Sequence, residues 1–172
     1  MSESKRFKVS EEELTSAKLT VSEEELTSIK EVAILDHSTL KKAISELGEV
    51  LNFIPKQEYT DPHGLYRFDV VWLEDEGLPP VKVFEVQVKG QTDLALTKLQ
   101  HARDVWRGSD LFIVITEERD FERAKRIIEP HLRGAFHRLK GLLMVLTADK
   151  IAHLHSFLMD YKELLHKLTK RD

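Results

Sequence analysis

The 172-residue chain contains no cysteine, which excludes disulfide bonds, thiolate zinc sites and cysteine nucleophiles. It also lacks a long apolar run, and its first residues, MSESKRFKVSEEE, lack the apolar stretch of a signal peptide. We therefore expect a soluble cytoplasmic protein with no contact to a membrane.

Amide side chains are scarce as well, with one asparagine and four glutamines, whereas 33% of the residues are charged. This usage resembles that of hyperthermophile proteins and suggests a thermophile as the source. The net charge of −4 argues against a wholly basic nucleic-acid binder but leaves room for a local basic face. With 41% hydrophobic residues, the length fits one compact domain and an appendage.

A twelve-residue repeat lies near the start of the chain, where VSEEELTSAK from Val9 recurs as VSEEELTSIK from Val21. Each copy has the Ser-x-x-Glu spacing of a capping box, which predicts the start of a helix. We expect residues 1–35 to form a helical N-terminal extension and residues 36–172 to form an α/β domain. The extension is either a pair of solvated helices or an arm for oligomerisation.

The hydrophobic periodicity of the domain predicts a helix, three successive strands, and then alternating helices and strands. The expected helices are 40–51, 92–106, 121–137 and 149–168, and the expected strands are 53–59, 66–73, 81–89, 111–116 and 142–147. The last two strands are apolar throughout, so both should be buried. This order predicts a mixed central sheet flanked by helices on both faces.

Polar residues interrupt two of the predicted core strands. Asp69 lies inside the second strand, while Glu85, Gln87 and Lys89 share one face of the third. A buried carboxylate needs compensation, and facing side chains of adjacent antiparallel strands lie about 5 Å apart. Asp69 and Glu85 could therefore converge on a Mg²⁺ or Mn²⁺ ion, with the carbonyl of Val86 as third ligand.

A second interpretation needs no metal. Arg67 lies on the same face as Asp69, and Lys89 lies on the same face as Glu85. The two carboxylates could then form a salt network with these cations.

These residues and the order of elements from about Leu40 to Thr116 resemble the PD-(D/E)xK nuclease superfamily, whose fold is called restriction-endonuclease-like. By position, Asp69 resembles the motif aspartate and Glu85 the motif glutamate. Gln87 stands where the motif lysine is expected, so the chain has a Glu-x-Gln variant. Lys89, one step further along the same face, could take over the role of that lysine. Phe68 stands where a proline usually precedes the aspartate.

The resemblance also implies roles for neighbouring helices. Glu46 and Glu49 compete for the acidic position of the first helix, and we prefer Glu49 because it lies nearer the end leading to the strands. Lys98, Gln100 and Arg103 on the following helix correspond to positions that support the site or contact nucleic acid.

The function implied by the resemblance is metal-dependent hydrolysis of phosphodiester bonds, in DNA more than in RNA. Asp69 and Glu85 would hold Mg²⁺ or Mn²⁺ and thereby activate water. A homodimer is expected, because cutting both strands of a duplex is easiest with two active sites. The alternative is a catalytically inactive domain that binds nucleic acid or another protein.

Overall fold

The computed structural model describes residues 36–129 and 134–169 of the chain. The predicted helices of the twelve-residue repeat lie outside these ranges. Within them, no helix combines the length and the apolarity that crossing a bilayer requires.

The first described helix is α3 (His37–Val50). Asp36 is the N-cap, and its carboxylate accepts a hydrogen bond from the N–H of Thr39 at 2.6 Å. The apolar side chains Leu40, Ile44 and Leu47 recur at helical spacing and are buried against the sheet. Cap and periodicity thus fix where this helix begins and which of its faces is buried.

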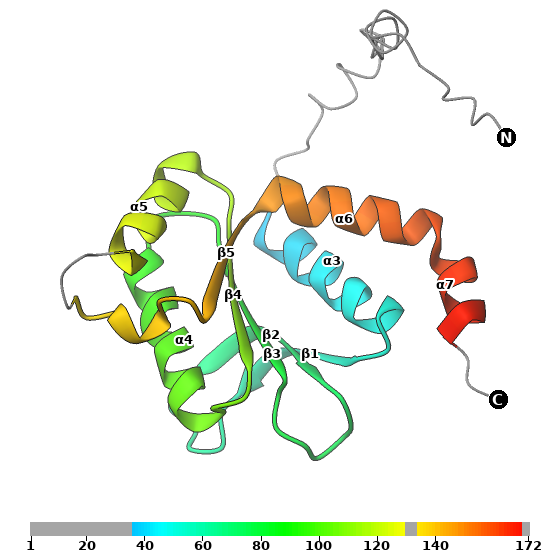
Figure 1. The fold of residues 1–172 in the computed structure, drawn as a ribbon, viewed down its shortest axis with the longest axis horizontal. Coiled ribbons are helices and arrows are strands. Elements are labelled where there is room, and N and C mark those ends of the chain that lie inside the picture. Colours follow the sequence, from blue (N-terminus) through cyan, green and yellow to red (C-terminus); the bar gives the residue numbers. More distant parts are fainter. Residues whose placement is uncertain (1–35, 130–133, 170–172) are drawn as a thin grey trace, which may run out of the picture. The chain divides into compact units, whose positions relative to one another are not determined.

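A mixed sheet of five strands, in the spatial order of the sequence, forms the centre of the domain (Figure 1). The first three strands pair antiparallel, and the last two join in parallel. They are β1 (Ile54–Thr60), β2 (Arg67–Leu73), β3 (Lys82–Gln87), β4 (Asp110–Ile115) and β5 (Leu143–Thr147). The predicted mixed sheet with flanking helices is confirmed.

Helices cover both faces of this sheet and create two hydrophobic cores (Figure 1). One core lies beneath α3 and α6 (Ala148–Asp160), and it includes Val70, Trp72 and Phe84 from the central strands. The other lies beneath α4 (Thr92–Val105) and α5 (Glu118–Ile128), and it includes Phe68 and Val83. The central strands are therefore covered on both sides, and a charged side chain there must find its partner inside the fold.

Three predicted elements differ from the structure. The helix expected over 121–137 ends at Ile128, since Pro130 follows and proline disfavours helix in the residue before it; His137–Leu139 forms a separate 3₁₀ turn. The helix expected over 149–168 is divided at Tyr161 into α6 and α7 (Lys162–Thr169). The last strand is not buried, because it lies at the edge of the sheet, where Met144 is 55% exposed.

Helix α3 approaches β2 most closely at Gly48. A Cβ atom at this position would lie 2.8 Å from Nε1 of Trp72. The indole ring is held by a hydrogen bond from Nε1 to the carbonyl of Ile44 at 3.2 Å and by ring contacts with Phe53 and Phe84. The glycine is needed because the ring cannot give way without losing these contacts.

We expect Gly48→Ala to lower the free energy of unfolding by about 1–3 kcal/mol, although alanine normally favours a helix. Urea denaturation followed by tryptophan fluorescence measures the change. Gly108→Ala is the matched control, because no atom lies within 4 Å of its Cβ position; it should change stability by no more than about 1 kcal/mol. Equal effects of the two substitutions would contradict the close approach.

Candidate functional site

A cleft of about 310 Å³ opens where β2 and β3 separate, between the start of α3 and the first half of α4. Six of the residues singled out in the sequence line it, namely Asp69, Glu85, Val86, Gln87, Lys89 and, from α4, Lys98. The structure therefore brings the predicted motif residues to one place.

The carboxylates of Asp69 and Glu85 each accept a hydrogen bond from a backbone N–H of the neighbouring strand, at the point where the regular pairing of β2 and β3 ends. The antiparallel ladder of β2 and β3 runs from Trp72 opposite Lys82 to Val70 opposite Phe84. Beyond it, the N–H of Asp69 donates to Oε1 of Glu85 at 3.3 Å, and the N–H of Val86 donates to Oδ2 of Asp69 at 2.7 Å. Carboxylate oxygens thus replace carbonyl oxygens as acceptors, and the two side chains lie close together.

The backbone of the neighbouring strand is irregular at the same level. Glu58 of β1 lies opposite Asp69, since Gln57 pairs with Val70 and Tyr59 with Phe68. Its φ angle is +51°, a left-handed conformation that costs a non-glycine residue energy. Lys41 of α3 and Arg67 of β2 both form ion pairs with the Glu58 carboxylate. These contacts hold the strained residue beside the site.

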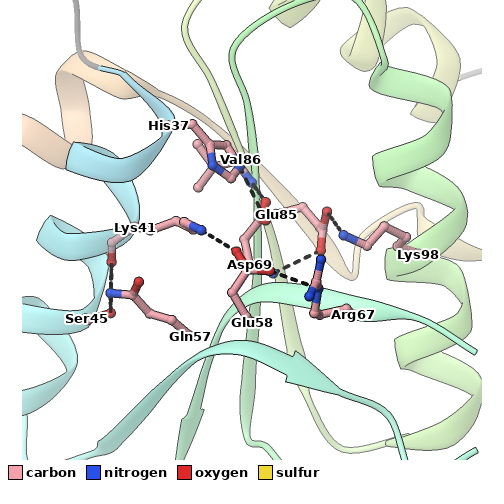
Figure 2. Close-up of polar contacts among 10 residues, drawn as sticks. All are labelled: His37, Lys41, Ser45, Gln57, Glu58, Arg67, Asp69, Glu85, Val86 and Lys98. Carbon is pink, nitrogen blue, oxygen red and sulfur yellow. Dashed lines mark hydrogen bonds and ion pairs between the residues drawn. The ribbon is translucent and has the colours of Figure 1, made fainter. Parts of the chain in front are cut away.

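Each of the two site carboxylates has a basic side chain beside it (Figure 2). Nζ of Lys98 lies 2.6 Å from Oε2 of Glu85, and Nε2 of His37 lies 3.3 Å from Oδ1 of Asp69. Figure 2 shows that His37 comes from the start of α3 on one side and Lys98 from α4 on the other. The two cations expected for a salt network are not these partners. Arg67 pairs with Glu58 at 3.0 Å, and Lys89 lines the cleft but is exposed beyond the end of β3.

The carboxyl group of Glu85 is only 4% exposed and has a strongly altered acidity. Burial and, secondly, the negative charge of Asp69 raise the pKa of Glu85 to about 8, although Lys98 acts in the opposite direction. Near neutral pH, this group can therefore exchange a proton when a cation enters the cleft.

The other predicted residues are more dispersed. The side-chain amide of Gln87 donates to the carbonyl of Lys89 at 2.9 Å. Glu49 is exposed near the far end of α3, about 18 Å along the helix axis from His37, and does not line the cleft. Glu46 instead contacts His155 of α6 at 2.6 Å.

Gln100 and Arg103 also lie outside the cleft. Gln100 borders a second pocket on α4, and a guanidinium nitrogen of Arg103 lies 3.8 Å from a carboxylate oxygen of Asp104. Of the three α4 residues assigned to nucleic-acid contact, only Lys98 reaches Glu85.

Sequence reasoning missed His37, the residue of α3 that does reach the site. From the sequence, the acidic residue of the site is expected near the end of the helix that leads to β1. The structure instead places the beginning of α3 at the cleft. The one feature in the sequence that could have indicated His37 is its position directly after the Asp36 cap, because the first turn of a helix projects beyond the face that packs on the sheet.

The oxygen donors of the cleft decide which divalent cation it suits. Among residues 36–129 and 134–169, no three His, Asp or Glu side chains converge to hold a metal ion. Asp69 and Glu85 remain, and Mg²⁺ is commonly held by one or two carboxylates while keeping several waters. Each carboxylate oxygen has two lone pairs, so the hydrogen bonds already present leave acceptor capacity. The residues fit Mg²⁺ or Mn²⁺, and they do not fit a structural zinc ion.

No family model matches this chain, and comparisons with curated proteins and with solved structures found no match either. The class that fold and site define is thus an α/β domain with a mixed five-stranded sheet and a paired-carboxylate cleft.

Proposed function

We propose that this chain is a metal-dependent nuclease with a restriction-endonuclease-like fold of the PD-(D/E)xK type. One observation carries the proposal: Asp69 and Glu85, from neighbouring strands, meet in an open cleft where the strands part. Paired carboxylates at such a position suit a hard divalent cation and a phosphodiester substrate.

In this proposal, Asp69, Glu85 and the carbonyl of Val86 hold Mg²⁺ or Mn²⁺. The bound ion supplies an activated water and neutralises charge that develops on the phosphate. Lys98 favours the ionised form of Glu85 and places a positive charge in the cleft. Gln87 contributes hydrogen bonds without charge. Lys98 therefore fills the role for which Lys89 was the sequence candidate.

The proposed substrate is DNA rather than RNA, and the proposed assembly is a homodimer in the cytoplasm. The preference for DNA follows from the resemblance of the motif, the homodimer from the need to cut two strands, and the location from the lack of an apolar leader stretch in the sequence. Lys98 is the α4 residue placed to meet a phosphate group, since it lines the cleft. Phosphate contacts of this kind supply affinity but no sequence preference.

A second candidate function is a nuclease-like domain that has lost catalysis and binds nucleic acid or a protein. Its support is that both carboxylates have basic partners from the chain itself, His37 for Asp69 and Lys98 for Glu85. In such a domain, the basic side chains would permanently take the place of a bound metal ion beside the two carboxylates.

Cleavage assays distinguish the two candidates. Plasmid DNA, branched DNA and RNA are incubated with the protein in Mg²⁺, Mn²⁺ or chelator. We expect cleavage of DNA that depends on the metal and is lost in Asp69→Asn. Binding of nucleic acid without cleavage in either metal would support the inactive domain.

The stability of Asp69→Asn gives an independent test. An asparagine still accepts the Val86 N–H, while the repulsion with Glu85 disappears, so in chelator the variant should be at least as stable as the parent. Mg²⁺ or Mn²⁺ should raise the melting temperature of the parent only. A clear loss of stability in chelator would instead show that Asp69 serves as the structural partner of His37.

A further inference from the structure

A second pocket, of about 380 Å³, lies on the face of α4 next to the face that borders the cleft. Gln91, Leu94 and Lys98 point to the cleft, whereas Gln100 and His101 point to the pocket. At 100° per residue, the two faces lie about 120° apart around the helix axis. The volume falls in the range of about 300–1,000 Å³ that is usual for small-molecule sites.

A contact between a buried carboxylate and an imidazole fixes one wall of this pocket. The side chain of Asp61 is fully buried, accepts hydrogen bonds from the N–H groups of Tyr66 at 2.6 Å and His63 at 3.0 Å, and lies 3.2 Å from Nε2 of His101. Burial tends to raise the pKa of Asp61, but these hydrogen bonds outweigh it and lower the pKa to about 2. This contact uses Nε2 of His101 and leaves Nδ1 as the second ring nitrogen for a hydrogen bond to another group.

The remaining lining combines aromatic surface with neutral polar groups. Tyr66 and Phe136 border the pocket, and the Tyr66 ring lies 4.8 Å from that of His101. In the part of the chain that the structure describes, neither the Tyr66 hydroxyl nor the Gln100 amide has a polar partner. None of the described residues that line the pocket is a lysine or an arginine, and Asp104 is one of them. This chemistry disfavours an anion and suits a flat, uncharged heteroaromatic ring.

We propose that the pocket of Tyr66, Gln100, His101 and Phe136 binds a single unstacked nucleobase. The choice of a nucleobase rests on the proposed function, because the backbone of a bound strand would lie in the adjacent cleft. Aromatic side chains take up unstacked bases by stacking, and an amide together with an imidazole ring nitrogen can hydrogen-bond the edge of the base. The strand is held by its phosphates on one face of α4 and by a base on the neighbouring face.

Nuclear magnetic resonance on the metal-free protein tests this proposal without cleavage. Adenosine and cytidine are titrated to millimolar concentration, and ribose 5-phosphate is titrated as the probe that lacks a base. We expect saturable shifts of the Gln100 side-chain amide and the His101 ring signals with the nucleosides and none with ribose 5-phosphate. Gln100→Ala should weaken nucleoside binding at least three-fold.

Gln57→Ala is the matched control, since Gln57 lies on β1 and donates to Ser45 instead of bordering the pocket. Tyr66→Phe, which keeps the ring, should fold normally and show an intermediate loss. Nucleosides that leave the pocket signals unchanged, or that bind Gln100→Ala as tightly as the parent, would overturn the nucleobase site even if the protein cuts DNA. Nucleoside binding by a protein that cuts nothing would instead reject the nuclease and retain the pocket.

Discussion

The free energy of unfolding of the metal-free protein is expected to fall as the pH rises from 4.5 to about 8. Burial and Asp69 raise the pKa of Glu85 from the usual 4.5 to about 8 in the folded state. Between these values, the folded chain keeps a proton that the unfolded chain releases, so each unit of pH costs up to about 1.4 kcal/mol. Below pH 4.5 both states hold the proton, so the stabilising contribution of Glu85 is fully present. Above about pH 8 both states have released it, and the contribution is lost completely.

Urea titrations at half-unit steps from pH 4.5 to 8.5, in chelator, measure this slope. Glu85→Gln should remove most of it, because the neutral amide has no proton to lose. Glu117→Gln is the matched control, since Glu117 is exposed and its side chain makes no capping bond; this variant should keep the parental slope. A parental curve that is flat, or that rises with pH, would contradict the buried and repelled state of Glu85.

Replacing Lys98 by methionine is expected to reduce DNA cleavage at pH 7.5 at least about 100-fold. Lys98 is the cation that lowers the pKa of Glu85, and without it the carboxyl group stays protonated to a higher pH. Both binding of the metal and stabilisation of the phosphate should suffer. Lys89→Met should lose less than about ten-fold, because Lys89 is exposed and lies beyond the end of β3.

Calorimetry of Mn²⁺ binding separates this role of Lys98 from a general loss of charge. In Lys98→Met, the pH at which Mn²⁺ binding is half-maximal should move upward, whereas in Lys150→Met it should stay in place. Lys150 lies exposed on α6, outside the cleft. If Lys89→Met loses more activity than Lys98→Met, then the lysine role belongs to Lys89.

The strands of the sheet and the meeting of Asp69 with Glu85 could be predicted from the sequence. Two local features of the sequence carry this prediction, the strict alternation in 81–89 and the carboxylate within an otherwise apolar strand. Facing side chains on neighbouring antiparallel strands lie close together, so the two carboxylates are expected to be in contact. By contrast, Phe68 and Val70 lie in different cores although strict alternation would put them on one face, and no periodicity in the sequence reports this irregularity.

The partners of the two carboxylates could not be predicted in this way. Lys98 and His37 come from helices, and their approach depends on the direction in which each helix crosses the sheet. The choice of Glu49 failed to anticipate this geometry, because the sequence marks which face of α3 is buried but not which end lies at the cleft. The break at Tyr161 has no glycine or proline to signal it.

Two backbone amides at the junction of β2 and β3 can report whether the cleft holds an ion, because they donate to the carboxylates of the cleft. The amides of Asp69 and Val86 donate to side-chain carboxylates and not to strand carbonyls. Their protection from deuterium should therefore follow the occupancy and charge of the carboxylates, whereas the amides of Val70 and Phe84 should follow global unfolding. A cation that draws the carboxylate oxygens toward itself would weaken the first pair of hydrogen bonds while stabilising the whole domain. Deuterium uptake would then rise at two positions and fall throughout the rest of the sheet, a signature that separates an ion seated in the cleft from one bound elsewhere on the surface.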